Sequence, residues 1–121
     1  MANRPHSICY IEIPAPGIEA SEAFYQTVFG WEIERSSLSP DSRYSEFRSK
    51  NLRGGLVEDR PVHQGGVLLY MKVGDIDACL QSIAAAGGSI VRPKFEIGAG
   101  HGFSALFRAP AGNELGLVAS S

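Results

Sequence analysis

The order of hydrophobic and polar residues predicts two halves that contain the same elements. In the first half, Ser7 to Ile13 alternates in character, as a strand with one apolar face does. Glu19 to Phe29 has helical spacing and ends at Gly30, a favourable C-cap residue. Three short stretches with strand character follow, at 31–37, 44–49 and 52–57, separated by turn residues. The short turns predict antiparallel neighbours.

The second half repeats this order after a linker from Glu58 to Gly65. A strand is predicted from Gly66 to Val73, and a helix from Asp75, a plausible N-cap, to Ala86. Gly87 and Gly88 end that helix. The remaining strands are predicted at 89–92, 102–108 and 114–119. The chain thus contains two half-repeats, at about 5–58 and 66–120.

Several apolar residues of the first predicted helix form one stripe, at Ala20, Ala23, Phe24, Thr27 and Val28. We expect Phe24, Tyr25 and Phe29 to pack this helix on its sheet, and Trp31 to close the core beneath the helix.

The repeat predicts an α+β fold in which two tandem βαβββ half-repeats form curled sheets. With 121 residues, the chain is expected to form a single domain over residues 1–121. The pattern by itself also fits a ferredoxin-like domain with extra strands.

Composition excludes several classes of partner. The formal net charge of −2 offers no basic excess for a nucleic acid. No apolar run approaches the roughly 20 residues of a membrane span, and the first residues lack the character of a signal peptide, so a cytoplasmic protein without membrane contact is expected. Cys9 and Cys79 lack the spacing of a metal or redox pair and are interpreted as buried small hydrophobes.

Four segments carry a family resemblance, in the order EIPAPGIEASEAFYQTVFGWEIE (12–34), GGL (54–56), VGDIDACLQSIAAAGGSIVRP (73–93) and APAGNELGLV (109–118). Over nearly the whole chain they resemble the vicinal oxygen chelate superfamily of glyoxalases, bleomycin-resistance proteins and dioxygenases. The resemblance implies curled mixed sheets around a cleft that binds a small molecule, and a homodimer. Because members of this superfamily catalyse different reactions or only bind drugs, whether this chain is an enzyme stays open.

The resemblance also implies where a metal would bind, at inward positions of the first and last strands of each half. In this sequence the first-strand histidine falls on Ile8 or Tyr10 and the last-strand glutamate falls on Gly116. The two other positions fall within Arg53 to Leu56 and on Leu68 or Tyr70. Good donors are missing from all four places, so no metal or other cofactor is expected. Zinc, nickel, iron or manganese would require other donors.

Other polar residues are candidates for contacting a ligand, namely Tyr10, Glu12, Tyr70, Lys72, His101 and Glu114. Glu12 and His101 are the candidates for a catalytic role. His101 lies in the glycine-rich stretch GAGHG, and a histidine titrates near neutral pH. A structural alternative is that Glu12 and Lys72 form a salt bridge, that the tyrosines line a packed sheet and that His101 is simply solvated.

Three functional hypotheses follow. The first is a metal-free homodimer that binds a small organic molecule in the cleft between the βαβββ modules. The second is a metal-dependent lyase or isomerase of the lactoylglutathione lyase type, with Glu12, Glu114 and His101 as unusual donors. The third is a structural or protein-interaction module whose cleft is filled by its own side chains, for which a cavity below about 300 Å³ would be evidence.

Overall fold

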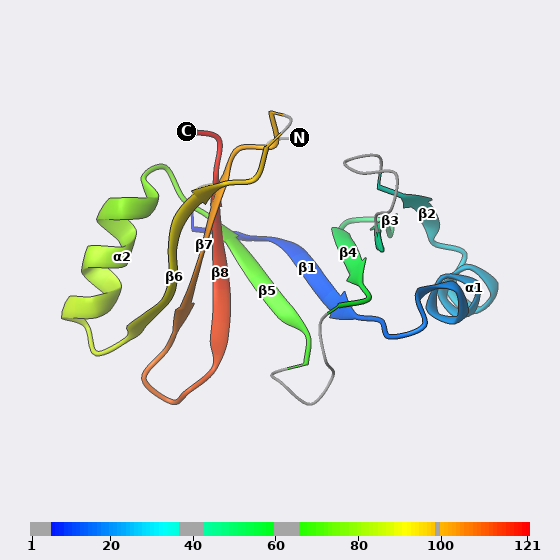
Figure 1. The fold of residues 1–121 in the computed structure, drawn as a ribbon, viewed down its shortest axis with the longest axis horizontal. Coiled ribbons are helices and arrows are strands. Elements are labelled where there is room, and N and C mark those ends of the chain that lie inside the picture. Colours follow the sequence, from blue (N-terminus) through cyan, green and yellow to red (C-terminus); the bar gives the residue numbers. More distant parts are fainter. Residues whose placement is uncertain (1–5, 37–42, 60–65, 99) are drawn as a thin grey trace. The chain divides into compact units, whose positions relative to one another are not determined.

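The computed structural model describes residues 6–36, 43–59, 66–98 and 100–121 (Figure 1). Its elements alternate as the two half-repeats predict, which confirms the α+β class. In chain order they are β1 (Ile8–Pro14), α1 (Ile18–Phe29), β2 (Glu32–Arg35), β3 (Tyr44–Arg48), β4 (Arg53–Val57), β5 (Leu68–Lys72), α2 (Ile76–Ala85), β6 (Ser89–Glu96), β7 (Phe103–Arg108) and β8 (Glu114–Ala119). Most of the predicted linker lies outside the described residues.

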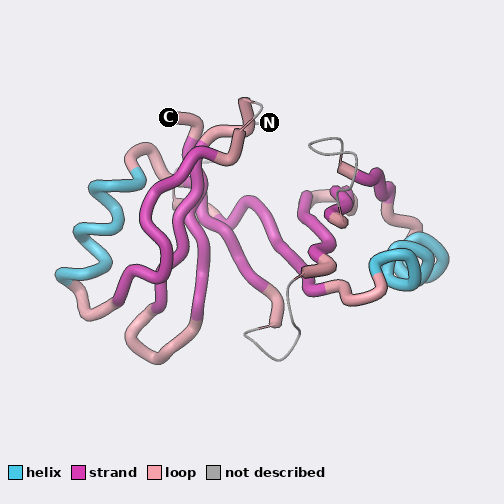
Figure 2. The backbone as a smooth tube through the Cα atoms, in the orientation of Figure 1, coloured by secondary structure: helices cyan, strands magenta, loops and turns pink. Residues whose placement is uncertain are grey.

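The chain divides into two compact units, one of which contains α1 and the other α2 (Figure 2). We call Tyr10–Leu68 the β1–β4 unit; the β5–β8 unit comprises Leu69–Ser121 together with the N-terminal residues up to Cys9. Neighbouring strands follow the order β2-β3-β4-β1 in one unit and β5-β8-β7-β6 in the other. In each unit, the first and last strands of the repeat pair in parallel, and the strands joined by short connections pair antiparallel as predicted. The ferredoxin-like alternative is therefore not the fold that forms.

One face of the β1–β4 sheet is covered by α1. Ile18 and Leu56 are fully buried there, and Phe47 lies beside them. The rings of Tyr25, Trp31 and Phe47 form a stack, with centroid distances of 4.7 Å and 4.3 Å. Trp31 thus closes the core beneath α1, as predicted.

The prediction for the aromatic residues of α1 was wrong in part. Tyr25 packs on the sheet, but 53% of Phe24 and 59% of Phe29 are exposed. The spacing of apolar residues could not predict which side of α1 is buried, because α1 carries apolar residues on more than one side. The α1 helix ends as expected, with the Gly30 N–H donating to the Gln26 carbonyl at 3.0 Å in a left-handed conformation.

The β5–β8 sheet is covered on one face by α2, as Figure 1 shows. Ile76 and Ala105 are fully buried in this core, and Leu117 is almost fully buried. Asp75 caps α2, because its carboxylate accepts a hydrogen bond from the Ala78 N–H at 3.0 Å. Strand β6 was predicted to end at Arg92 but continues to Glu96 through Pro93. As the terminal strand of this unit's order, with irregular pairing around Arg92, it tolerates a proline.

Both cysteines are partly buried rather than buried as expected. Cys79 packs against the α2 core, and its burial raises the pKa of its thiol. None of the described helices combines the length and the hydropathy of a membrane span.

Candidate functional site

Polar side chains gather on the face of the β1–β4 sheet that is turned away from α1. Alternation along each strand and the pairing register assign them to one side, because Ile13, Phe47 and Leu56 point to the α1 core. We call this side the tyrosine face. It carries Tyr10, Glu12, Glu32, Glu34, Tyr44, Glu46, Arg48, Arg53 and Gly55.

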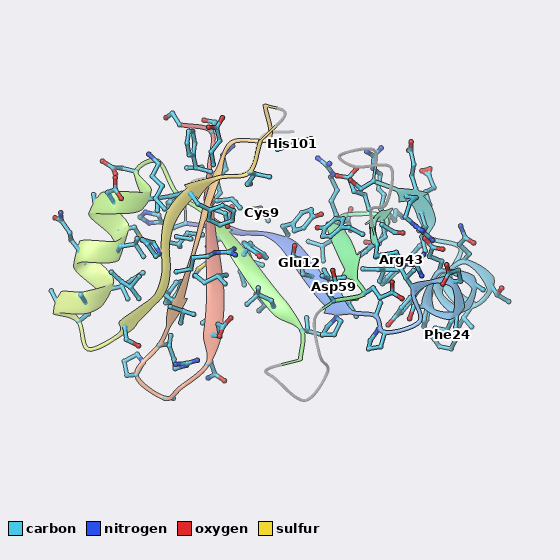
Figure 3. The ribbon with its side chains drawn as sticks, in the orientation of Figure 1. Cys9, Glu12, Phe24, Arg43, Asp59 and His101 are labelled. Carbon is cyan, nitrogen blue, oxygen red and sulfur yellow. The ribbon has the colours of Figure 1, made fainter. Side chains whose placement is uncertain are left out.

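A chain of three hydrogen-bonding groups crosses this face. The Tyr44 hydroxyl donates to Glu12 Oε2 at 3.1 Å, and the hydroxyls of Tyr10 and Tyr44 are 2.5 Å apart. A tyrosine hydroxyl has one hydrogen; because Tyr44 donates its own to Glu12, Tyr10 is the donor to Tyr44. Figure 3 labels Glu12, which lies on β1. The chain therefore runs from Tyr10 through Tyr44 to the Glu12 carboxylate.

Gly55 makes this crossing possible. It lies between β1 and β3 in the register, opposite Glu12 on one side and Glu46 on the other. A Cβ atom at Gly55 would overlap the hydroxyl and ring of Tyr44. The absence of a side chain at this position thus lets Tyr44 reach over β4.

Burial and nearby negative charge raise the pKa of both hydroxyls, which are protonated at neutral pH. Burial raises the pKa of Tyr10 to about 12, and the charges of Glu12 and Glu46 add to this against the opposing effects of the Tyr44 hydrogen bond and Arg53. Burial raises the pKa of Tyr44 as well, with the Glu12 charge as the next cause. The two phenols therefore act as neutral hydrogen-bonding groups.

Three other predicted ligand residues lie in the β5–β8 unit. Tyr70 is buried and its ring lies over Gly116, its partner in the register, while Glu114 pairs with Arg108 at 3.4 Å. The backbone N–H of Lys72 donates to the Ser7 carbonyl at 2.9 Å. The strand register assigns Tyr70, Lys72 and Glu114 to the side that points away from the α2 core.

Figure 3 shows His101, the sixth predicted residue, in the turn between β6 and β7. Its side chain is exposed, and its backbone N–H donates to the Gly98 carbonyl at 3.0 Å. This exposed position agrees with the alternative of a solvated histidine.

The structure thus brings Tyr10 and Glu12 together, and the residue that sequence reasoning missed is Tyr44. The alternation of Tyr44, Glu46 and Arg48 in the third strand was the available signal for a polar face. That the predicted residues of the two units share one cleft stays a prediction.

In two of the four segments where the resemblance places a metal ligand, the residues do not fit a metal. Gly55 and Gly116 supply no side-chain donor, and tyrosine rings occupy the space that an acidic side chain would need. Within the described ranges, no three His, Cys, Asp or Glu side chains form a group that could hold an ion. The second hypothesis, in which Glu12 of one unit and Glu114 and His101 of the other are donors, stays a prediction.

A cavity of about 160 Å³ lies under α2 in the β5–β8 unit. Its lining is apolar apart from His6, and includes Met71, Cys79 and Phe107. It is small compared with usual ligand pockets. All of its lining residues belong to the β5–β8 unit.

Comparison with known proteins identifies the family. Residues 7–117 match the sequence profile of the Glyoxalase/Bleomycin resistance protein/Dioxygenase superfamily. The chain belongs to this superfamily, in agreement with the resemblance seen in its motifs. A glyoxylase-like domain-containing protein of Didymella fabae is 24% identical over 94 residues, which are 73% of either chain.

Solved structures share the fold at low sequence identity. A superfamily member from Vibrio splendidus matches with a TM-score of 0.67 and 18% identity, over 94% of this chain and 97% of that chain. Methylmalonyl-CoA epimerase from Mycobacterium tuberculosis matches with a TM-score of 0.68 and 13% identity, over 100% of this chain and 93% of that chain. These likenesses establish the fold.

Proposed function

We propose that this protein binds a small polar organic molecule on the tyrosine face without a metal. The observation that carries the proposal is the chain from Tyr10 through Tyr44 to Glu12. The chain places a carboxylate and two hydroxyls together on a sheet face that the unit's own helix does not cover. A small molecule with its own hydrogen-bonding groups can exchange hydrogen bonds with such a cluster.

The composition of the tyrosine face indicates the chemistry of the ligand. Two phenol rings supply flat apolar surface together with neutral hydroxyls, a combination that suits a ring or an unsaturated group bearing oxygen atoms. The arginines Arg48 and Arg53 can hold a carboxylate or phosphate of such a molecule. The glutamates favour hydroxyl or amine groups at other points.

The superfamily provides further support. One methylmalonyl-CoA epimerase with 16% identity and a TM-score of 0.68 was solved in complex with methylmalonyl-CoA and ammonium. A small acid on a carrier is therefore a reasonable probe for this chain. Because Gly55 and Gly116, in two of the four segments where the resemblance places metal ligands, lie under tyrosine side chains, we propose binding without metal-assisted lyase or dioxygenase chemistry.

A thermal-shift screen tests the proposal. The probes are methylmalonyl-CoA, S-lactoylglutathione, bleomycin and a library of small carboxylic acids and phenols, each with and without a chelator. A probe that binds raises the melting temperature by mass action, and the rise should survive the chelator. Tyr44→Phe and Glu12→Gln should reduce its affinity about tenfold or more.

Tyr25→Phe is the matched control, because it removes a tyrosine hydroxyl on the α1 side of the same sheet. Its affinity for the probe should equal that of the wild type. Equal weakening by all three variants, or a library without any binder, would contradict the proposal. Binding that disappears with the chelator would restore the metal-dependent hypothesis.

The third hypothesis retains one observation in its favour. Tyr10 and Tyr44 form a hydrogen bond with each other on the tyrosine face, and the ring of Tyr70 fills the space over Gly116 on the β5–β8 sheet. Side chains of the protein therefore occupy part of the helix-free face of each sheet. If the faces are filled in this way, Tyr10→Phe should lower stability and no probe should bind. The same screen therefore distinguishes a binding protein from a structural module.

A further inference from the structure

The core between α2 and the β5–β8 sheet contains the cavity of about 160 Å³ described above, which we call the α2 cavity. The helix contributes Cys79 and Ile83 to its wall, and His6 also lines it. The strands contribute four buried or half-buried apolar side chains, those of Met71, Val73, Phe107 and Leu117.

A short side chain at position 79 leaves part of this space open. The other α2 residues of the same core are the larger aliphatic residues Ile76, Leu80 and Ile83. The Cys79 side chain ends one atom beyond its Cβ, so it extends less far toward the sheet than a leucine would. Burial raises the pKa of its thiol, as an apolar environment does. Position 79 is therefore a place at which one substitution can fill the cavity.

The lining suits an apolar molecule better than water. A buried water needs roughly two to four hydrogen-bonding partners. The thiol of Cys79 and the thioether of Met71 are weak hydrogen-bonding groups, and the aliphatic and phenyl side chains have none. Among the described lining residues, only His6 has a side chain with strongly polar atoms.

His6 marks the side on which the cavity opens to solvent, because it is the one exposed residue among the described residues of the lining. Two backbone hydrogen bonds hold its segment against β5. The His6 N–H donates to the Lys72 carbonyl, and the Lys72 N–H donates to the Ser7 carbonyl at 2.9 Å. A molecule can therefore reach the apolar walls beside His6.

We propose that the α2 cavity binds a small apolar molecule with the size of a single aromatic ring. The volume indicates the size, since an engineered protein cavity of about 150 Å³ lined by leucine, isoleucine and phenylalanine takes up benzene. An empty cavity lowers stability in proportion to its volume, because its walls lack contacts on one side. A ligand that fills the space restores those contacts. Phe107 and the Met71 thioether favour an aromatic ring in particular.

Benzene is the probe, added up to saturation of the buffer. It should raise the melting temperature of the wild type by mass action, with a dissociation constant of about 1 mM or below. Cys79→Leu extends a side chain into the cavity and should weaken binding at least about tenfold. Ala84→Leu is the matched control, because it adds a leucine at an exposed position of the same helix. Its affinity for benzene should equal that of the wild type.

Nuclear magnetic resonance of ¹³C-labelled methionine methyl groups locates the bound benzene. The signal of Met71 should move as benzene is added, because the methionine lines the cavity and an aromatic ring shifts nearby nuclei. Met71→Leu, which conserves the side-chain volume, assigns this signal. Tyr44→Phe should leave the benzene affinity unchanged, since benzene forms no conventional hydrogen bond with the tyrosine face. This test is thus independent of the function proposed for that face.

Two kinds of result would overturn the proposal. The first is a wild type whose melting temperature and Met71 signal both stay unchanged in benzene-saturated buffer. The second is a benzene affinity that Cys79→Leu leaves intact, or that Ala84→Leu lowers equally. If circular dichroism shows that Cys79→Leu has lost its fold, Cys79→Met replaces it, because the flexible methionine side chain adapts to irregular spaces.

Discussion

Tyr44 on β3 donates its hydroxyl to the Glu12 carboxylate on β1 at 3.1 Å, across the backbone of Gly55 on the intervening strand β4. The three residues form one unit, since the hydrogen bond requires the glycine. Their dependence on one another can be measured.

Gly55→Ala should destabilise the protein by about 2–3 kcal/mol, because the added Cβ overlaps Tyr44. In the Tyr44→Ala background the same change should cost less than about 1 kcal/mol, since the ring is gone. Urea unfolding of the four proteins measures this coupling. If Gly55→Ala causes the same loss of stability with and without the Tyr44 ring, overlap with Tyr44 is not the reason for the glycine.

Alkaline pH should weaken the fold through Tyr10. Its pKa is raised from 10.0 to about 12, so the folded state holds a proton that the unfolded state has released between these values. The stabilisation is complete below pH 10 and is lost as the pH rises through 12, by roughly 2–3 kcal/mol at 1.36 kcal/mol per pKa unit.

Denaturation at pH 9 and pH 11.5 measures this loss. Tyr10→Phe should be less stable than the wild type at pH 9 and should show a shallower decline toward pH 11.5. Absorbance at 295 nm should show fewer ionised tyrosines in the folded protein than in urea. A decline in Tyr10→Phe as steep as that of the wild type would contradict this assignment.

Acid should weaken the attachment of α1 through Glu22. Two hydrogen bonds of 3.1 Å from Arg35 lower the pKa of Glu22, and a hydrogen bond from Ser45 contributes to this. This stabilisation is present above the ordinary carboxyl pKa of about 4.5 and is lost as the pH falls through the lowered folded value.

Glu22→Gln should therefore lower the free energy of unfolding by up to about 1 kcal/mol at pH 7, because solvent screens much of the attraction between Glu22 and Arg35. Its urea midpoint should change less than that of the wild type between pH 7 and pH 3. Glu96→Gln, a change of an exposed carboxylate on β6, should follow the wild-type profile. An identical acid response in Glu22→Gln and the wild type would exclude this role.

Two buried serines should respond in opposite ways to alanine. Ser45 accepts a hydrogen bond from Arg35 at 3.2 Å and donates to Glu22, whereas the buried Ser104 hydroxyl meets no hydrogen-bond partner among the described residues. Ser45→Ala should cost about 1–2 kcal/mol, and Ser104→Ala should be neutral or stabilising. The urea midpoints of the two variants measure these effects. A large loss of stability in Ser104→Ala would show that the Ser104 hydroxyl has a hydrogen-bond partner.

Local pattern determined most of the secondary structure. Alternation located β1 and predicted that Tyr10 and Glu12 share a face, because successive side chains of a strand point to opposite sides. Asp75 and Gly30 marked helix ends through backbone groups only a few residues away. Such features depend on neighbours in the chain, so they can be recognised without the fold. The order of these local signals along the chain also predicted the βαβββ repeat.

Only the tertiary structure decided the composition of the tyrosine face and the orientation of α1. Tyr44 is 32 residues from Glu12, and their contact depends on the order of β1, β4 and β3 and on a glycine in the middle strand. The α1 helix has apolar residues on two sides, and the stacking of Tyr25 on Trp31 selected the side that faces the sheet. Phe24 was left outside by that choice. Spacing along the chain specifies which residues share a side, whereas packing against distant residues determines which side is buried.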